Sequence, residues 1–162
     1  MEADLIARIL LLLTVANGAP VLAAKLLAAR WAHPIDAGVV CRDGHPVLGR
    51  SKTVRGLAAS LLATAACAPV VELMFIDGLL LAAAAMAGDL AASFIKRRMG
   101  LAPSSMAFGL DQIPETLLPC LVLAERLGLS WGDIIAVVGC FLVGELVVSR
   151  LLFRLGIRDR PY

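Results

Sequence analysis

Five apolar segments take up most of this chain of 162 residues. They cover approximately residues 5–29, 57–71, 73–94, 113–127 and 134–155. A helix needs about 20 largely apolar residues to cross a bilayer, so segments of this kind predict a polytopic membrane protein. The composition agrees, because 60% of the residues are hydrophobic and only 17% are charged, whereas soluble domains have about 25% charged residues. We therefore expect an all-α bundle of five transmembrane helices, with residues 1–162 forming a single integral-membrane domain.

The positive charges predict how this bundle is oriented. Thirteen of the 15 Lys and Arg residues lie in or beside the loops 30–56 and 95–112 or near the C-terminal end, and the opposite side has only Arg8 and Arg126. Cytoplasmic loops of membrane proteins are enriched in Lys and Arg. We therefore expect the N-terminus outside, the C-terminus in the cytoplasm and both long loops cytoplasmic. The net charge of +2 is too small to indicate a nucleic-acid partner.

The first long loop ends in a run that suits an anion. Residues 49–56 (Gly-Arg-Ser-Lys-Thr-Val-Arg-Gly) combine glycines, hydroxyl groups and three cations directly before the second apolar segment. Free backbone amides and the helix dipole at such an entry both favour phosphate. The run lacks the spacing of a P-loop, and a solvated basic loop is the alternative interpretation.

A second cluster of polar residues ends the third apolar segment. Asp89, Ser93 and Lys96 are spaced i, i+4, i+7, so they share one face of a helix. A carboxylate within a membrane helix is costly and by default indicates function. We expect the partner of Asp89 to be Lys96 or a bound cation, and the alternative is a structural Asp–Lys pair at the membrane interface.

Further carboxylates follow the second long loop. Asp111 and Glu115 are expected near the same membrane depth as Asp89. Carboxylates that face a cluster of cations are what Mg²⁺-dependent nucleotidyl or phosphoryl transfer requires, since Mg²⁺ is held by one or two carboxylates plus substrate phosphates and Lys or Arg neutralises the developing charge. We predict Asp89, Asp111 and Glu115 as metal ligands. Glu145, in the middle of the last segment, needs a partner that the sequence does not identify.

Several short motifs occur in an order that resembles a known family. They are Asn17-x-x-Pro20, Pro34-Ile35-Asp36-x-Gly38, Asp43-Gly44, Gly49-x-x-Lys52-Thr53-x-Arg55-Gly56, Gly88-Asp89-x-x-x-Ser93-Phe94-Ile95-Lys96-Arg97-Arg98 and Asp111-Gln112. Together they resemble the CDP-archaeol synthase family, small five-span relatives of the phosphatidate cytidylyltransferases. The resemblance extends from about residue 14 to 115. The chain departs from the family pattern at Pro114, where members commonly have a second Asp, and Glu115 follows directly.

This resemblance implies a reaction and a set of site residues. CTP and a phosphorylated lipid, such as archaetidic acid, would give a CDP-lipid and pyrophosphate with Mg²⁺, in a pocket on the cytoplasmic face of the cell membrane. It implies catalytic roles for Asp89, Lys96 and Asp111. The residues that it implies for nucleotide or phosphate binding are Asp36, Asp43, Lys52, Thr53, Arg55, Ser93 and Arg97. No protein nucleophile is expected, because an oxygen of the lipid phosphate attacks.

Two alternatives remain at this point. A phosphatidate cytidylyltransferase that makes CDP-diacylglycerol would need the same head-group machinery, and the lipid-facing surface is too generic to distinguish it. A small transporter or an assembly subunit would be a protein of another class without enzymatic activity. Transporters gather polar residues near the bilayer midplane, whereas here they gather at one face, which favours the enzyme.

Overall fold

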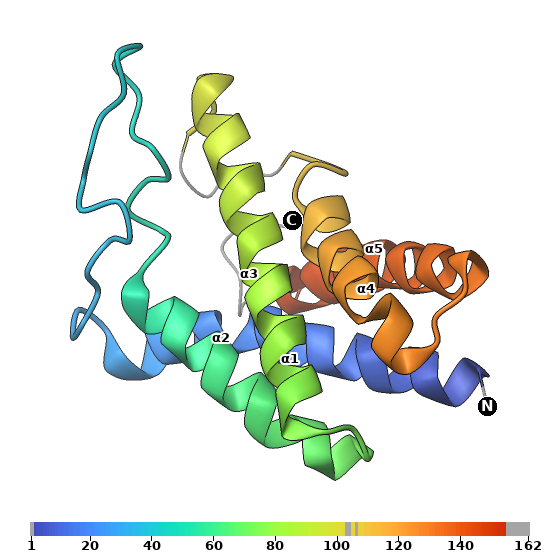
Figure 1. Cartoon of the computed structure of the whole chain (residues 1–162). Coiled ribbons are helices and arrows are strands. Elements are labelled where there is room, and N and C mark those ends of the chain that lie inside the picture. The colour runs from blue at the N-terminus through green and yellow to red at the C-terminus, as the bar shows by residue number, and fades with distance from the viewer. Residues whose placement is uncertain (1, 103–104, 106, 155–162) are drawn as a thin grey trace.

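The computed structural model describes residues 2–102, 105 and 107–154, and the regular secondary structure of this part is helical. The helices are α1 (Glu2–Leu27), α2 (Val54–Cys67), the short 3-10 helix η1 (Ala68–Val71), α3 (Phe75–Arg98), α4 (Gln112–Leu127) and α5 (Trp131–Arg154) (Figure 1). Within the described residues there is no strand, and the α1–α2 loop has two isolated bridges, Pro34 with Thr53 and Val40 with Pro46. The all-α prediction is confirmed for this part of the chain.

Each predicted apolar segment contains one long helix. The second segment splits, since α2 ends at Cys67 and η1 continues to Val71. In the described part of the chain, three stretches have the length and apolar composition that a membrane crossing requires: Ala3–Leu27, Val54–Val71 and Phe75–Arg98. Helix α3 packs against α1, α2 and α4, and α5 packs against α1 and α4.

A proline within α1 fixes how α2 packs on it. Pro20 has no N–H, so it cannot donate the helical hydrogen bond to the carbonyl of Ala16. The hydroxyl of Ser60 on α2, which is fully buried, donates to this carbonyl at 2.8 Å instead. At Gly56 an added Cβ would lie 3.3 Å from the Cβ of Pro20, so α1 and α2 approach closely where α2 begins. This contact places the start of α2 beside the C-terminal half of α1.

Helices α3 and α4 meet at a second glycine. A Cβ at Gly88 would lie 2.3 Å from the carbonyl oxygen of Pro114 and 2.7 Å from the amide nitrogen of Glu115. Only a residue without a side chain allows backbone this close. The contact holds Asp89, the next residue on α3, beside the first turn of α4.

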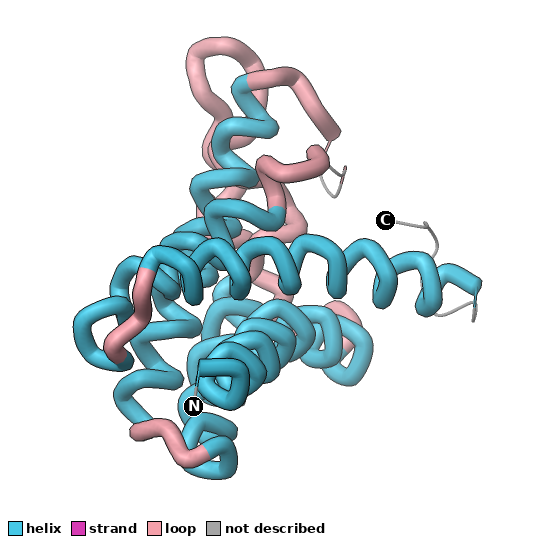
Figure 2. The backbone as a smooth tube through the Cα atoms, turned by 90° about the vertical axis from the view of Figure 1, so that its right-hand side faces the viewer, coloured by secondary structure: helices cyan, strands magenta, loops and turns pink. Residues whose placement is uncertain are grey.

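Ion pairs join the elements at one end of the bundle. Arg8 on α1 pairs with Asp4 at 2.7 Å and with Glu72, in the turn before α3, at 2.6 Å. Arg126 at the end of α4 pairs with Asp77 at the start of α3 at 2.8 Å. The long α1–α2 loop, the end of α3 and the start of α4 lie at the opposite end, as the loops in Figure 2 show. The end with the α1–α2 loop is called the loop end below.

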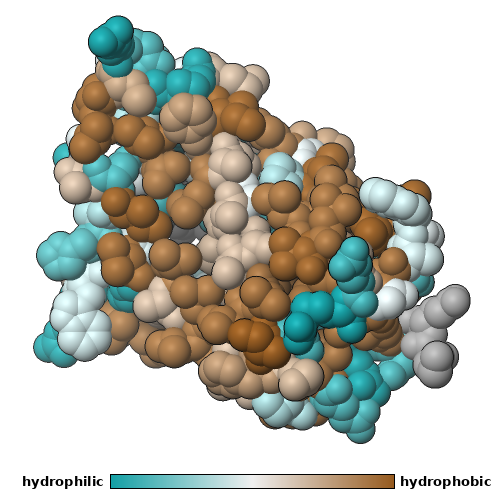
Figure 3. Space-filling view, viewed as in Figure 1, coloured by the Kyte–Doolittle hydropathy of each residue, from teal (hydrophilic) through white to brown (hydrophobic). Residues whose placement is uncertain are grey.

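The outer surface is largely apolar. In Figure 3 a broad hydrophobic band separates hydrophilic residues at the upper left from others at the lower right of this face. Large apolar side chains such as Leu26, Leu62 and Val70 are more than two-thirds exposed. A water-soluble protein rarely exposes large contiguous apolar patches, whereas a helix in a bilayer presents such side chains to lipid.

Candidate active site

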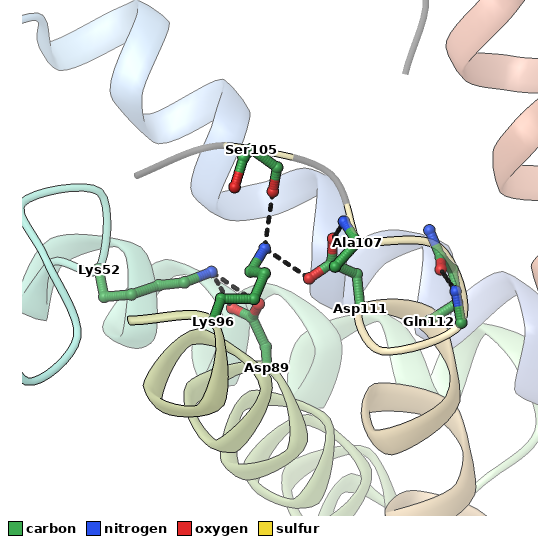
Figure 4. Close-up of polar contacts among 8 residues, drawn as sticks. Lys52, Asp89, Lys96, Ser105, Ala107, Asp111 and Gln112 are labelled. Atoms are coloured by element: carbon green, nitrogen blue, oxygen red, sulfur yellow. Dashed lines mark hydrogen bonds and ion pairs between the residues drawn. The ribbon is translucent and has the colours of Figure 1, made fainter. Parts of the chain in front are cut away.

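Two lysine–aspartate pairs lie at the loop end of α3. The first joins the α1–α2 loop to α3, because Nζ of Lys52 donates to both carboxylate oxygens of Asp89, at 2.6 and 2.5 Å (Figure 4). Both side chains are 23% exposed. The expected partner of Asp89 was Lys96 or a bound cation, and the structure gives Lys52 instead. The α1–α2 loop returns to α3 at this point, and Lys96 turns away towards α4.

The second pair joins α3 to the start of α4. Nζ of Lys96 lies 2.5 Å from a carboxylate oxygen of Asp111 and donates to the carbonyl of Ser105 at 2.9 Å. The other oxygen of Asp111 accepts the N–H of Ala107 at 2.8 Å, and the side-chain oxygen of Gln112 accepts the N–H of Gly109 at 2.8 Å. Figure 4 shows these contacts around the turn that leads into α4. The turn therefore holds the carboxylate of Asp111 against the α3 cation.

Arg97 is a buried cation next to these pairs. Arg97 is only 2% exposed, and its Nε and Nη1 atoms have no hydrogen-bond partner in the described part of the chain. Asp111 acts on it electrostatically, but the two form no ion pair among the described residues. A buried charge without a partner is costly. An anionic ligand would supply the missing partner.

The carboxylates of the first loop stabilise the loop itself. Asp36 accepts the N–H groups of Gly38, Leu48 and Gly49 at 3.1, 2.8 and 2.9 Å. Burial alone would raise the pKa of Asp36, but these hydrogen bonds outweigh it and hold the pKa below its ordinary value. Asp43 pairs with Arg98 through both carboxylate oxygens at 2.7 Å. Both aspartates, which were predicted to bind nucleotide, thus have partners within the protein.

Two other predicted phosphate ligands also make local contacts. The hydroxyl of Thr53 accepts the N–H of Gly56 at 3.1 Å and thereby caps α2. Nη1 of Arg55 donates to the carbonyls of Ala28 and Arg30 at 2.8 and 2.7 Å, which closes the end of α1. Both contacts use only Nη1 of Arg55, and the residue also lines the cavity described below.

Ser93 and Glu115 lie inside the helix bundle. Ser93 is buried on the same face of α3 as Asp89, as the helical spacing predicts, and Glu115 is buried in the first turn of α4. Glu115 interacts electrostatically with Glu145, Asp89 and Lys52. Helix α5 therefore brings Glu145 to the site. The sequence had singled out this glutamate only as a charge in an apolar segment, with no role.

A cavity of about 360 Å³ opens beside the Lys52–Asp89 pair. Its apolar wall comes from three helices and includes Pro20, Ala24, Leu57, Met86 and Leu90. Its polar wall includes Arg50, Ser51, Lys52, Thr53, Arg55 and Asp89. A cavity with this division suits a ligand that has a charged group at one end and an apolar body.

The predicted metal ligands do not form a ligand set by themselves. Among the described residues, no three His, Cys, Asp or Glu side chains are grouped closely enough to hold a metal ion. Asp89 and Asp111 each face a lysine instead, and Glu115 lies beside Asp89 across the α3–α4 contact. Mg²⁺ at a nucleotide site takes one or two carboxylates plus phosphate oxygens. The carboxylates of Asp89 and Asp111 fit such an ion, and metal binding stays a prediction.

Comparison with known proteins identifies the family. The family model described as "CarS-like: CDP-archaeol synthase" matches residues 63–162. The CDP-archaeol synthase of Aeropyrum pernix is 33% identical over 156 residues, 91% of this chain and 86% of that protein, and that of Pyrobaculum calidifontis is 34% identical over 91% of each. A solved structure, described as an intramembrane enzyme for archaeal membrane lipids biosynthesis, covers 88% of this chain and 90% of its own, with a TM-score of 0.76 and 30% identity. Because the family model spans more than half of the chain, this membrane protein belongs to the CDP-archaeol synthase family.

Proposed function

We propose that this chain is an integral-membrane cytidylyltransferase that transfers CMP from CTP to a phosphorylated lipid of the archaetidic-acid type. The products are a CDP-lipid, CDP-archaeol with that substrate, and pyrophosphate. The family membership supports the reaction. The observation that carries it is the group of cations at the loop end. Lys52 and Lys96 each face one aspartate there, and two nitrogens of the buried Arg97 have no hydrogen-bond partner among the described residues.

The chemistry needs positioning and charge neutralisation more than a reactive side chain. An oxygen of the lipid phosphate forms a bond to the α-phosphorus of CTP, and the bond from that phosphorus to the oxygen bridging to the β-phosphate breaks. Pyrophosphate leaves with the electron pair. Lys52, Lys96 and Arg97 would bind the phosphate groups and offset the negative charge that accumulates on them. Holding both phosphates in line is itself a large part of the catalysis.

Magnesium is the cofactor that this set of side chains fits. Asp89 and Asp111 would hold the ion together with phosphate oxygens of CTP, with Glu115 as a further carboxylate nearby. When bound, Mg²⁺ supplies additional positive charge at the reacting phosphates. Lys52 and Lys96 neutralise the two aspartates in the ligand-free protein. When CTP binds, their ammonium groups would donate to phosphate oxygens instead.

The cavity beside Lys52 suits the lipid substrate. Its cationic wall would take the lipid phosphate, and the wall formed by Pro20, Ala24 and Leu57 would take the first carbon atoms of the chains. Lys96 and Arg97 lie on the other side of Asp89, towards α4, and would take the nucleotide phosphates. Each substrate thus has its own cations, and the two phosphates meet near Asp89.

The proposed orientation follows from the charges and the helix lengths. Helix α5 has 24 residues and rises about 36 Å, whereas α4 has 16 residues and rises only about 24 Å. We infer that all five long helices cross the cell membrane, with α4 the shortest crossing. The loop end, which carries most of the positive charge, faces the cytoplasm, where CTP is available. The N-terminus then lies outside and the C-terminus inside.

A direct assay tests this proposal. Purified protein in detergent receives CTP, Mg²⁺ and either archaetidic acid or phosphatidate, and both pyrophosphate and CDP-lipid are measured. We expect both products with archaetidic acid, and a larger rate with phosphatidate would reassign the substrate to ester lipids. Asp89→Asn should abolish both products, while Asp133→Asn, at the start of α5 where the carboxylate accepts from Ser130, should retain them. An Asp89→Asn protein with full activity would refute the role of Asp89.

A further inference from the structure

The α1–α2 loop is attached to α3 at two separate points. Close to its C-terminal end, Lys52 pairs with Asp89, and at its tip, residues 43–46 contact Arg98 in the last turn of α3. Nine residues of α3 separate the two attachment points, which corresponds to about 13 Å along the helix. Figure 1 shows the loop extending beside the C-terminal end of α3.

Arg98 contacts the loop tip through both of its terminal guanidinium nitrogens. Its Nη1 donates to both carboxylate oxygens of Asp43 at 2.7 Å, and its Nη2 donates to the carbonyls of Pro46 at 2.6 Å and His45 at 3.2 Å. The guanidinium carbon also lies 5.2 Å from the centre of the Phe94 ring. A planar guanidinium can make all of these contacts at once, and the ammonium group of a lysine cannot.

Hydrogen bonds connect the tip of the loop to Lys52. Near the tip, the N–H of Cys41 donates to the carbonyl of His45 at 2.8 Å, and that of Val47 donates to the carbonyl of Val39 at 3.0 Å. At its base, the N–H of Ile35 donates to the carbonyl of Lys52 at 2.9 Å. The carboxylate of Asp36 connects these two parts through its contacts with residues 38, 48 and 49. Movement of the tip therefore changes where the backbone of Lys52 lies.

We propose that Arg98 is a positioning residue, which fixes the loop tip on α3 and thereby holds Lys52 at Asp89 without touching either substrate. The effect of Arg98 on turnover rests on the proposed function, whereas its effect on the position of Lys52 does not. Loss of Arg98 releases the tip, and Lys52 then leaves Asp89 part of the time. Lys96 and Arg97, which belong to α3 itself, keep their places.

The first test uses the ligand-free protein, so it does not depend on the reaction. The accessibility of the Lys52 amine is measured by its rate of acylation with an N-hydroxysuccinimide ester, read by peptide mass spectrometry and normalised to the exposed Lys25. Arg98→Met should raise the labelling of Lys52 several-fold and speed amide exchange at Cys41 and Val47. Arg98→Lys should give an intermediate result. Unchanged labelling of Lys52 in a folded Arg98→Met protein would overturn the proposal.

The second test separates positioning from direct binding. In Arg98→Met we expect turnover to fall by between about tenfold and a hundredfold, the loss typical of a misplaced group, while the affinity for CTP changes less than twofold. Arg98→Lys should recover part of the turnover. Arg42→Met, the same change at the neighbouring exposed arginine of the tip, is the control and should behave like the wild type. Loss of CTP binding in Arg98→Met would make Arg98 a ligand and overturn the proposal.

A matched pair of variants checks the contact itself. Asp43→Asn should reproduce part of the effect of Arg98→Met on the labelling of Lys52, and the double variant should add little to Arg98→Met, because both remove the same interaction. Fully additive effects would show that Asp43 and Arg98 act independently, contrary to the proposal. A wild-type protein that forms no CDP-lipid would refute the proposed function, and the labelling result would still decide the role of Arg98.

Discussion

Replacing Gly88 by alanine tests the packing that builds the site. The added Cβ would lie 2.3 Å from the carbonyl oxygen of Pro114, 2.4 Å from its carbonyl carbon and 2.7 Å from the amide nitrogen of Glu115. These are backbone atoms, which cannot rotate away as a flexible side chain would. Helices α3 and α4 must therefore separate by roughly 1 Å to restore ordinary van der Waals contact.

The expected cost follows from two opposing terms. Overpacking of this kind costs about 1–3 kcal/mol, and the upper end applies here because the whole α3–α4 contact has to open. The better helix propensity of alanine returns about 1 kcal/mol, which leaves a net destabilisation of about 2 kcal/mol. Gly139→Ala in α5 is the matched control, since a Cβ there meets nothing within 4 Å. That variant should gain stability by up to about 1 kcal/mol.

Thermal unfolding in detergent and CDP-lipid formation measure the two consequences. For a chain of this length, 2 kcal/mol corresponds to a fall in Tm of about 4–8 °C, and Gly139→Ala should unfold at or above the wild-type temperature. Because the first turn of α4 moves relative to Asp89, activity in Gly88→Ala should fall by about a hundredfold. A Gly88→Ala protein with wild-type Tm and activity would refute the close α3–α4 contact.

Three further predictions concern single side chains. Lys52→Met should tighten the binding of Mn²⁺ in the absence of CTP, because Asp89 loses its cation, and turnover should fall. Electron paramagnetic resonance measures the Mn²⁺ affinity, and an unchanged affinity would contradict the pairing. Ser60→Ala should lower the free energy of unfolding by about 1–3 kcal/mol, measured in detergent, because the carbonyl of Ala16 is left without a donor. Burial alone would raise the pKa of Asp36, but three N–H donors lower this pKa in the folded loop. The contribution of Asp36 to loop stability is therefore complete above the unfolded pKa of about 3.9. It is lost as the pH falls through the lower folded pKa. Amide exchange of the loop between pH 6 and 3 should show this loss in the wild type, and Asp36→Asn should abolish that pH dependence.

Helical periodicity predicted the face of α3 that carries the site, but not the ion pairs on it. The spacing of Asp89, Ser93 and Lys96 is local, so it could be read from the sequence. The partner of Asp89 lies 37 residues earlier, in a loop whose path no local pattern specifies. Lys96 was the nearest cation in sequence and pairs with Asp111 instead. Pairing across loops depends on tertiary packing, here on the Gly88 contact and the return of the α1–α2 loop.

The polar first loop shows a second reason why a sequence alone is ambiguous. An aspartate beside glycines is equally suited to bind a ligand and to accept backbone N–H groups in a turn. Asp36 does the latter three times, and Asp43 takes an arginine from α3. The family motifs place both residues in the loop that carries Lys52. Their contacts in the structure make them supports of the loop that presents Lys52, a distinction that composition and spacing do not contain.

The two ends of the bundle carry charge in different ways, and the difference supports the loop end as the proposed ligand site. At the end opposite the loops, Arg8 and Arg126 each have an acidic partner, so those pairs can be explained by helix packing alone. At the loop end, Arg97 is more deeply buried than either and has two nitrogens without a partner among the described residues. Burying an uncompensated charge costs several kcal/mol, a penalty that serves no purpose in a purely structural helix end. A phosphate group bound there would remove the penalty and would stabilise the folded protein by about 2.7 kcal/mol at a hundred times its Kd, so the same guanidinium that weakens the ligand-free bundle would favour the proposed nucleotide binding.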